Sequence, residues 1–216
     1  MKDKFVKKYA VDVLCDSQAN IAYRIELINK IGEARLNSVP NVRAELCDDV
    51  VIVAQDLITP DKGQKLGLAH LRNLATDLHF ISQLGFVHGD INRRNVCATR
   101  TSFAVLDFEP CLRQRIGNRI QFKVTLPYLS NKDREKNNVS SLTDKLGFYY
   151  FVRRFTGSFG PRDIVQLSRT RNHAAYLGFP EDELNHKTFQ ELVDDGLSHT
   201  LTPKSDPDPA SPSPRK

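Results

Sequence analysis

A short polar loop between a long amphipathic helix and an apolar strand limits the possible folds of this chain more than any other segment. The loop covers residues 88–95 (HGDINRRN), and the strand that follows it delivers a second acidic residue, Asp107. A tight loop can point Asp90 and Asn95 toward one site, and the strand end can bring Asp107 beside them. Oxygens of Asp and Asn suit Mg²⁺, which also takes water and substrate phosphates as ligands. The pattern therefore indicates phosphoryl transfer, with a carboxylate that accepts the proton of an incoming hydroxyl.

The segments around this loop predict a chain of mixed helices and strands. Strand-like composition is found over residues 4–14, in two runs within 42–58 that turn at Asp48–Asp49, and over 103–108. Helical spacing of apolar residues predicts helices over 21–36, 67–84 and 141–155, and one or two more within 161–196, among them 180–196. Residues 109–140 are polar and are expected to be irregular.

Composition excludes several classes of protein. The chain has 216 residues, of which 40% are hydrophobic and 26% charged, as in an ordinary globular domain. Its net charge of +5 suits a phosphate-containing ligand or an acidic partner. Because no Lys/Arg stripe with interleaved aromatic residues is present, we expect no nucleic-acid partner. No apolar run approaches about 20 residues, so we expect no membrane span.

The cysteines and the first residues bear on the cellular compartment. Cys15, Cys47, Cys97 and Cys111 form no Cys-x-x-Cys pair and have no neighbouring His cluster, so a zinc site is not expected. The charged start of the chain lacks the apolar segment of a signal peptide. We therefore expect a cytoplasmic monomer with reduced thiols. A secretion signal of the kind carried by bacterial effectors would leave no trace in this test.

The loop and the strand after it resemble the catalytic core of the protein-kinase-like superfamily, which reads H-x-D-x-x-x-x-N followed by D-F-G. The resemblance implies that Asp90 is the catalytic base and that Asn95 and Asp107 hold the metal ions. Gly89 in His-Gly-Asp and Glu109 in Asp-Phe-Glu are similar to aminoglycoside and choline kinases, and Gly89 also to several small or atypical bacterial kinases.

The resemblance extends upstream to a strand with a lysine and to the helix that follows it. Residues 5–9 (FVKKY) resemble the strand whose lysine contacts the ATP phosphates; Lys7 fits best, and Lys8 is the alternative. Glu26, 19 residues after Lys7, would be the ion-pair partner that fixes this lysine, with Glu33 as the alternative. The resemblance thus implies that Lys7 and Glu26 belong to the nucleotide site.

Downstream, residues 124–129 (VTLPYL) resemble the end of an activation segment. Asp144, near the start of the next helix, is similar to the aspartate that anchors the catalytic loop of kinases through its backbone amides. The 37 residues from Asp107 to Asp144 match the long activation segment of protein kinases. The length of this segment therefore favours a protein kinase, whereas the catalytic loop favours a small-molecule kinase.

The chain also departs from the family pattern, at Gly89, at Glu109 and in two further places. Only six residues precede Lys7, so no Gly-rich phosphate loop is present and the N-lobe is reduced, unless the true start lies upstream. Asn92 stands where the family has a lysine, and Arg93 or Arg94 would have to replace it on the γ-phosphate.

These observations predict an α+β, protein-kinase-like fold with two lobes. We expect a reduced N-lobe over 1–58 (a short antiparallel sheet and one helix), a mainly helical C-lobe over 59–197, and a disordered tail over 198–216. The expected function is an ATP- and Mg²⁺-dependent (or Mn²⁺-dependent) phosphotransferase of the serine/threonine-protein kinase type, acting on a hydroxyl acceptor in a protein. The alternatives are a pseudokinase scaffold without the nucleotide roof, and a kinase for aminoglycosides, choline or sugars.

Overall fold

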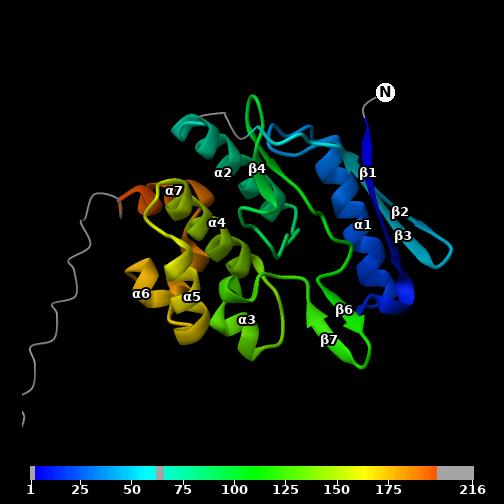
Figure 1. Ribbon diagram of the computed structural model, residues 1–216. Coiled ribbons are helices and arrows are strands. Elements are labelled where there is room, and N and C mark those ends of the chain that lie inside the picture. Colours follow the sequence, from blue (N-terminus) through cyan, green and yellow to red (C-terminus); the bar gives the residue numbers. More distant parts are fainter. Residues whose placement is uncertain (1–2, 62–65, 199–216) are drawn as a thin grey trace, which may run out of the picture.

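The computed structural model describes residues 3–61 and 66–198 (Figure 1) and shows a mixed helical and stranded chain with small antiparallel sheets, as the expected α+β class requires. The strands are β1 (Lys4–Ala10), β2 (Val42–Cys47), β3 (Val50–Asp56), β4 (Val96–Ala98), β5 (Phe103–Val105), β6 (Arg113–Ile116) and β7 (Arg119–Phe122). The α-helices are α1 (Gln18–Glu33), α2 (Leu68–Gln83), α3 (Asn131–Glu135), α4 (Ser141–Phe155), α5 (Pro161–Thr170), α6 (His173–Leu177) and α7 (Phe189–Ser198). Single 3-10 turns are η1 (Val11–Val13), η2 (Leu126–Tyr128) and η3 (Glu181–His186).

A three-stranded antiparallel sheet in the order β1-β3-β2 forms one side of the molecule, on the right in Figure 1, and α1 packs against it. The β2–β3 hairpin turns at Asp48–Asp49, as the sequence predicts, with Asp48 in the left-handed region (φ 53°) that short polar side chains tolerate. Alternate residues of β3 face the core, since Val51, Val53 and Gln55 are buried.

Helix α1 is fixed at its start and along its apolar face. The Ser17 hydroxyl accepts a hydrogen bond from the backbone N–H of Asn20 and caps the first turn. Asn29 joins the helix to β2 through two hydrogen bonds of 2.9 and 2.8 Å with the backbone of Ala44. The residues that α1 buries are Ile21, Ile25, Leu27, Ile28 and Ile31. This packing holds α1 in a fixed position relative to the strands.

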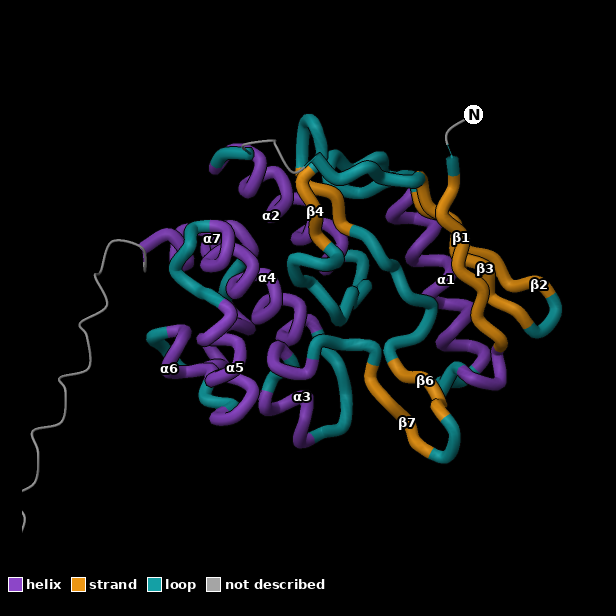
Figure 2. Tube along the Cα trace, in the orientation of Figure 1, coloured by secondary structure: helices purple, strands orange, loops and turns teal. Residues whose placement is uncertain are grey.

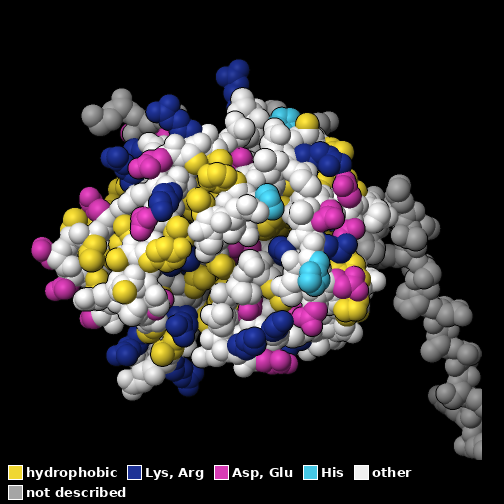
Figure 3. All heavy atoms as spheres, turned by 180° about the vertical axis from the view of Figure 1, so that it is seen from behind, with side chains coloured by type: hydrophobic (Ala, Val, Ile, Leu, Met, Phe, Trp, Pro, Cys, Tyr) yellow, Lys and Arg dark blue, Asp and Glu magenta, His cyan; other side chains and the backbone are white. Residues whose placement is uncertain are grey.

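Helices α2, α4 and α7 pack together on the other side of the molecule. Figure 2 shows that the segments from α2 to β4 and from β5 to β6 run as loops between this helical side and the sheet. In the described part of the chain, no helix is long and apolar enough to cross a membrane. Seen from behind, basic, acidic and hydrophobic side chains are interspersed over the surface (Figure 3). The loops in the middle carry most of the expected site residues.

Three sequence predictions of local structure were wrong. Residues 109–140 are not irregular but form the β6–β7 hairpin, η2 and α3, and the hairpin turns at Gly117 with φ 60°. The strand expected over 4–14 ends at Ala10, where η1 begins. The helix expected over 180–196 is divided into η3 and α7, because Thr188 breaks it: its N–H and hydroxyl both bond Glu191, which caps a new helix. Helix α7 continues to Ser198, and residues 199–216 of the expected disordered tail lie outside the described residues.

Buried His173, at the start of α6, predicts how stability depends on pH. Its Nδ1 lies 2.9 Å from the Tyr150 hydroxyl, and burial lowers the pKa of this imidazole to about 4. Burial also lowers the pKa of His88. Both histidines thus have a pKa below their value in the unfolded chain, which means that the folded state favours the neutral ring. The stability that the neutral rings contribute is lost as pH falls below about 6.5, because the unfolded chain then binds protons more readily.

We therefore expect the contribution of His173 to the free energy of unfolding to fall by about 3 kcal/mol as pH is lowered from about 7 to about 4. Asp144 acts in the opposite direction, because its raised pKa adds stability as the carboxyl is protonated. Urea unfolding of wild type and of each variant at a series of pH values gives the slope of stability against pH and isolates the His173 contribution. His173→Gln should change that slope by this amount, whereas His186→Gln, which changes an exposed histidine, should not change it. An equal slope in wild type and His173→Gln would contradict the prediction.

Candidate active site

One cleft brings together three of the residues that the sequence singles out. Lys7 from β1, Asn95 from the loop before β4 and Asp107 from the end of the β5 segment all line a cavity of about 250 Å³. The cavity lies where the sheet meets the loops of the helical side. Its other lining residues are Phe5, Gln55, Leu57, Ile58, Arg94 and Leu106. A cation, an amide and a carboxylate therefore share one partly apolar cleft.

The Asp90 carboxylate is held beside this cleft by donors from two segments of the chain. Its Oδ2 accepts a hydrogen bond of 2.7 Å from Asn95 Nδ2. Its Oδ1 accepts bonds from Asn92 Nδ2 at 2.8 Å and from the backbone N–H of Thr125 at 2.7 Å. Asn92, at the position where the family has a lysine, is buried and also donates to the Thr125 hydroxyl. These contacts fix the direction of the carboxylate.

His88 joins the 88–95 loop to the segment that leads to Asp107. Its Nε2 lies 2.8 Å from the carbonyl oxygen of Leu106, and the backbone N–H of Asp90 donates to its Nδ1 at 3.3 Å. The ring also packs edge-on against Phe108, with centroids 5.3 Å apart. Burial lowers the pKa of His88, so the ring stays neutral and joins the loop to the strand that carries Asp107.

Asp144, in the first turn of α4, anchors the same loop from the helical side. Its Oδ2 accepts the backbone N–H of His88 at 2.7 Å, and its Oδ1 accepts that of Gly89 at 2.6 Å. Burial raises the pKa of Asp144 to about 7, while the two backbone bonds and the nearby Arg24 favour the ionised form. The anchoring role implied by the resemblance thus corresponds to a direct contact.

Asp107 occupies an unusual backbone conformation at the centre of a charge network. Its φ of 71° lies in the left-handed region, which a non-glycine residue adopts at a cost. Its carboxylate forms an ion pair with Lys7, whose Nζ also lies 3.2 Å from Glu109. Glu109 is buried and pairs in turn with Lys123 at 3.0 Å. Two carboxylates and two lysines therefore alternate in one network of ion pairs that begins in the cleft.

The expected ion pair between Lys7 and Glu26 is absent from the structure. Glu26 is exposed on α1 and pairs with Lys30 one turn later, at 2.6 Å. The alternative partner, Glu33, is also exposed. Lys7 instead pairs with Asp107 and with Glu109. Because strand residues alternate in direction, Lys7 points into the cleft and Lys8 points to solvent.

Arg24 is a contact residue that the sequence interpretation missed. Its side chain donates from Nε to the carbonyl of Glu109 and from Nη2 to the carbonyl of Val87, both at 2.9 Å. The guanidinium lies 4.2 Å from the centroid of the Phe86 ring, and burial lowers its pKa to about 10. The sequence feature that could have identified Arg24 is a charged residue within the apolar face of α1, three residues after Ile21. Arg24 ties α1 to both loops of the site.

The side chains of the cleft offer oxygen ligands of the kind that suit Mg²⁺ rather than zinc. No group of three or more His, Cys, Asp or Glu side chains that could hold a metal occurs within residues 3–61 and 66–198. Asn95 and Asp107 instead offer oxygen ligands in the same cleft. Magnesium is commonly held by one or two carboxylates together with water and substrate phosphates, whereas structural zinc needs a closed set of four ligands.

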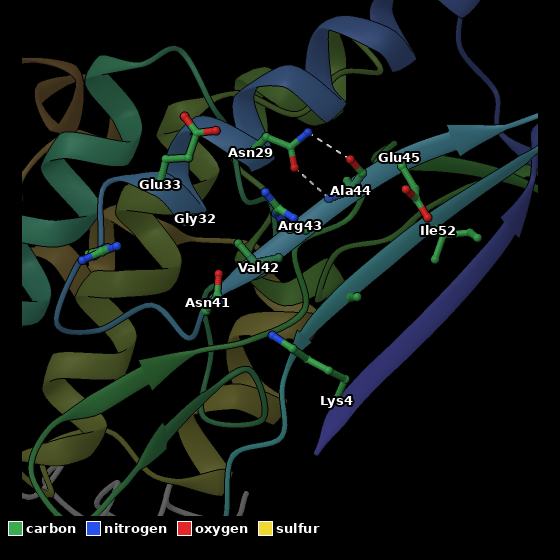
Figure 4. A pocket seen from close by; sticks show the side chains of 12 residues that line it. Lys4, Asn29, Gly32, Glu33, Asn41, Val42, Arg43, Ala44, Glu45 and Ile52 are labelled. Carbon is green, nitrogen blue, oxygen red and sulfur yellow. Dashed lines mark hydrogen bonds between the residues drawn. The ribbon is translucent and has the colours of Figure 1, made fainter. Parts of the chain in front are cut away.

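Two larger hollows lie away from this chemistry. One, of about 720 Å³, is drawn in Figure 4 between the end of α1 and the strands, lined by Glu33, Arg43 and Glu45 among others. The other, of about 730 Å³, adjoins it and continues toward Arg100. Neither contains a residue of the 88–95 loop or Asp107. Size alone therefore does not locate the candidate site.

Comparison with known proteins adds no family assignment. No protein-family model matches the chain, and no curated protein sequence matches it. The geometry of the cleft and of its supporting loops is thus the basis for any proposal about function.

Proposed function

We propose that this protein is a Mg²⁺- and ATP-dependent phosphotransferase of the serine/threonine-protein kinase type, with a protein-kinase-like fold. One observation carries the proposal: Lys7, Asn95 and Asp107 line one cleft, and Asn95 is hydrogen-bonded to Asp90 at its edge. A cation for phosphate, oxygen ligands for magnesium and a carboxylate base are the parts that phosphoryl transfer requires. The residues that supply these parts lie between positions 7 and 107 of the sequence. The fold, and not closeness in the sequence, therefore brings them together.

The arrangement of the elements also supports the proposal. The small sheet with α1 and the helical part of the chain lie on opposite sides of the central loops (Figure 1), and the cleft is lined by strands of that sheet and by these loops. This agrees with the expected N-lobe over residues 1–58 and C-lobe over 59–197. The direct bonds from His88 and Gly89 to Asp144 agree with the anchoring of a catalytic loop.

The residues suggest a division of labour. Lys7, positioned by Glu109 rather than by Glu26, would neutralise phosphate oxygens. Magnesium, held by Asn95 and Asp107, would offset the charge that develops on the transferred group. Asp90 would accept the proton of the acceptor hydroxyl while its oxygen forms a bond to the γ-phosphorus. The bond from that phosphorus to the β–γ bridging oxygen breaks, and ADP leaves with the electron pair.

Transfer of labelled γ-phosphate tests this division. We expect Asp90→Asn to slow transfer at least about 100-fold, because a general base is lost, and Asp107→Asn to do the same by removing a metal ligand. Asp49→Asn, in the exposed β2–β3 turn, is the matched control and should keep wild-type activity. The proposal fails if folded wild-type protein, saturated with Mg-ATP, transfers phosphate to no protein, to no alcohol of a small-molecule panel, not to itself and not to water.

Two observations favour the alternative of a non-catalytic, pseudokinase-like binding module. The charges of Lys7 and Asp107 neutralise each other directly, and the cleft of about 250 Å³ is smaller than typical ligand pockets of about 300–1,000 Å³. A ligand that binds only the native state must raise the melting temperature. A thermal shift with Mg-ATP therefore supports the enzyme, and its absence at millimolar Mg-ATP supports the binding module.

A further inference from the structure

Two arginines beside the catalytic loop have no acidic partner. Arg93 is exposed on the loop, three residues after Asp90, and Arg154 is half-buried near the end of α4. Neither forms an ion pair within the described part of the chain. Most charged side chains around the nucleotide cleft, by contrast, are paired. Unpaired cations next to the proposed base are available to a ligand.

Tyr128 belongs to the segment that contacts the proposed base. Three residues before it, the backbone N–H of Thr125 donates to Asp90 Oδ1 at 2.7 Å. The Tyr128 ring stacks on Tyr150 of α4, with centroids 5.4 Å apart, which fixes η2 against that helix. The segment that contacts Asp90 is therefore packed against α4, the helix that carries Arg154.

A pocket of about 370 Å³ lies next to these cations. Arg93 and Arg154 are on its rim, and Phe103, Phe151 and Phe155 are among its apolar lining residues. The rings pack edge-on, with the centroids of Phe151 and Phe155 5.4 and 5.6 Å from that of Phe103, so they form a rigid wall. Asp61 is the only carboxylate among the lining residues. The pocket thus suits an apolar group with negative charge beside it.

The two arginines between Asn92 and Asn95 line different cavities. Arg94 lines the nucleotide cleft, whereas Arg93 lines this second pocket. Arg94 is accordingly the better candidate for the γ-phosphate, and Arg93 is free for the acceptor. The loop therefore presents one arginine to the nucleotide cleft and the other to the second pocket.

We propose that the acceptor is an acidic polypeptide segment, whose apolar side chain fills the pocket walled by Phe103, Phe151 and Phe155. Asp or Glu residues flanking its Ser or Thr would pair with Arg93 and Arg154. A polypeptide suits this surface better than a small anion because the lining combines two cations, one from a loop and one from a helix, with three aromatic rings. The inference rests on the proposed phosphotransferase function, and it names the acceptor of that site.

Peptide binding without nucleotide tests the acceptor independently of catalysis. Fluorescence anisotropy would compare three labelled peptides of equal length, each with one central serine and one leucine, whose flanking residues are all Glu, all Gln or all Lys. We expect the Glu peptide to bind about tenfold more tightly than the Gln peptide at low salt, with the difference lost at high salt. The Lys peptide should bind most weakly.

Variants assign the preference to the pocket. Arg93→Gln/Arg154→Gln should bind Glu and Gln peptides within about twofold of each other, with an unchanged melting temperature and unchanged Mg-ATP thermal shift. The control, Arg43→Gln/Arg169→Gln, removes the same charge from exposed positions elsewhere and should keep the full preference. The inference is overturned if the Glu peptide binds no better than the Gln peptide, if the arginine variant keeps the preference, or if a phosphorylated sugar displaces the Glu peptide more effectively than unlabelled peptide does. If the protein transfers no phosphate but still binds the Glu peptide selectively, the proposed function fails and the peptide-binding site stands.

Discussion

Asp144→Ala is expected to lower the free energy of unfolding by about 2–5 kcal/mol and to remove phosphate transfer. The substitution leaves the buried backbone N–H groups of His88 and Gly89 without an acceptor, at a cost of about 1–3 kcal/mol for each. Because both groups belong to the segment that carries Asp90, the loop should also lose its position. Urea unfolding measures the first effect, and transfer of labelled phosphate by the folded fraction measures the second.

Two further variants separate anchoring from ordinary helix capping. Asp144→Asn keeps one side-chain oxygen as an acceptor but places an amide nitrogen against the other backbone N–H. Its loss of stability should therefore be smaller than that of Asp144→Ala. Asp163→Ala removes a carboxylate that bonds the Gly160 N–H at the start of α5, and it should cost about 1 kcal/mol. If Asp144→Ala were no more destabilising than Asp163→Ala, the contacts of Asp144 would not be the anchor that holds the loop.

Gly147→Ala should reduce both stability and activity, although alanine is normally the better helix former. Within a helix the change usually stabilises by about 1 kcal/mol. Here, a Cβ on Gly147 would lie 2.4 Å from the carbonyl oxygen of Ile91, the residue after Asp90. The backbone of the loop must therefore move away from α4. We expect a loss of about 1–3 kcal/mol in unfolding free energy and a clear loss of phosphate transfer per folded molecule.

Gly196→Ala in α7 is the matched control for this prediction. A Cβ there would also be too close to its neighbour, 2.5 Å from Cγ1 of Val152, but that atom belongs to the core and not to the loop. Both variants should therefore lose stability, while only Gly147→Ala should lose activity once the folded fraction is taken into account. Equal specific activity in the two variants would show that α4 does not set the position of Asp90 through Ile91.

The sequence alone predicted those features that depend on local rules. Helical spacing of apolar residues located α1, α2 and α4, and strand composition with the Asp48–Asp49 turn located β2 and β3. The polar pattern of the 88–95 loop singled out Asp90 and Asn95, which prove to be hydrogen-bonded neighbours. Such residues lie within one short segment, so the geometry of that segment largely determines how they meet.

Only the tertiary structure decided which distant charges meet. Lys7 pairs with Glu109, 102 residues away, because β1 points it into the cleft while Glu26 turns to solvent on α1. Arg24 reaches the loops because it replaces an apolar residue on the buried face of α1. Arg93 and Arg154 line one pocket because Phe103 of β5 packs on Phe151 and Phe155 of α4, and β5 pairs with β4, the strand that follows the loop. Sequence periodicity reports which face of an element is buried, but the partner across the core depends on the packing of whole elements.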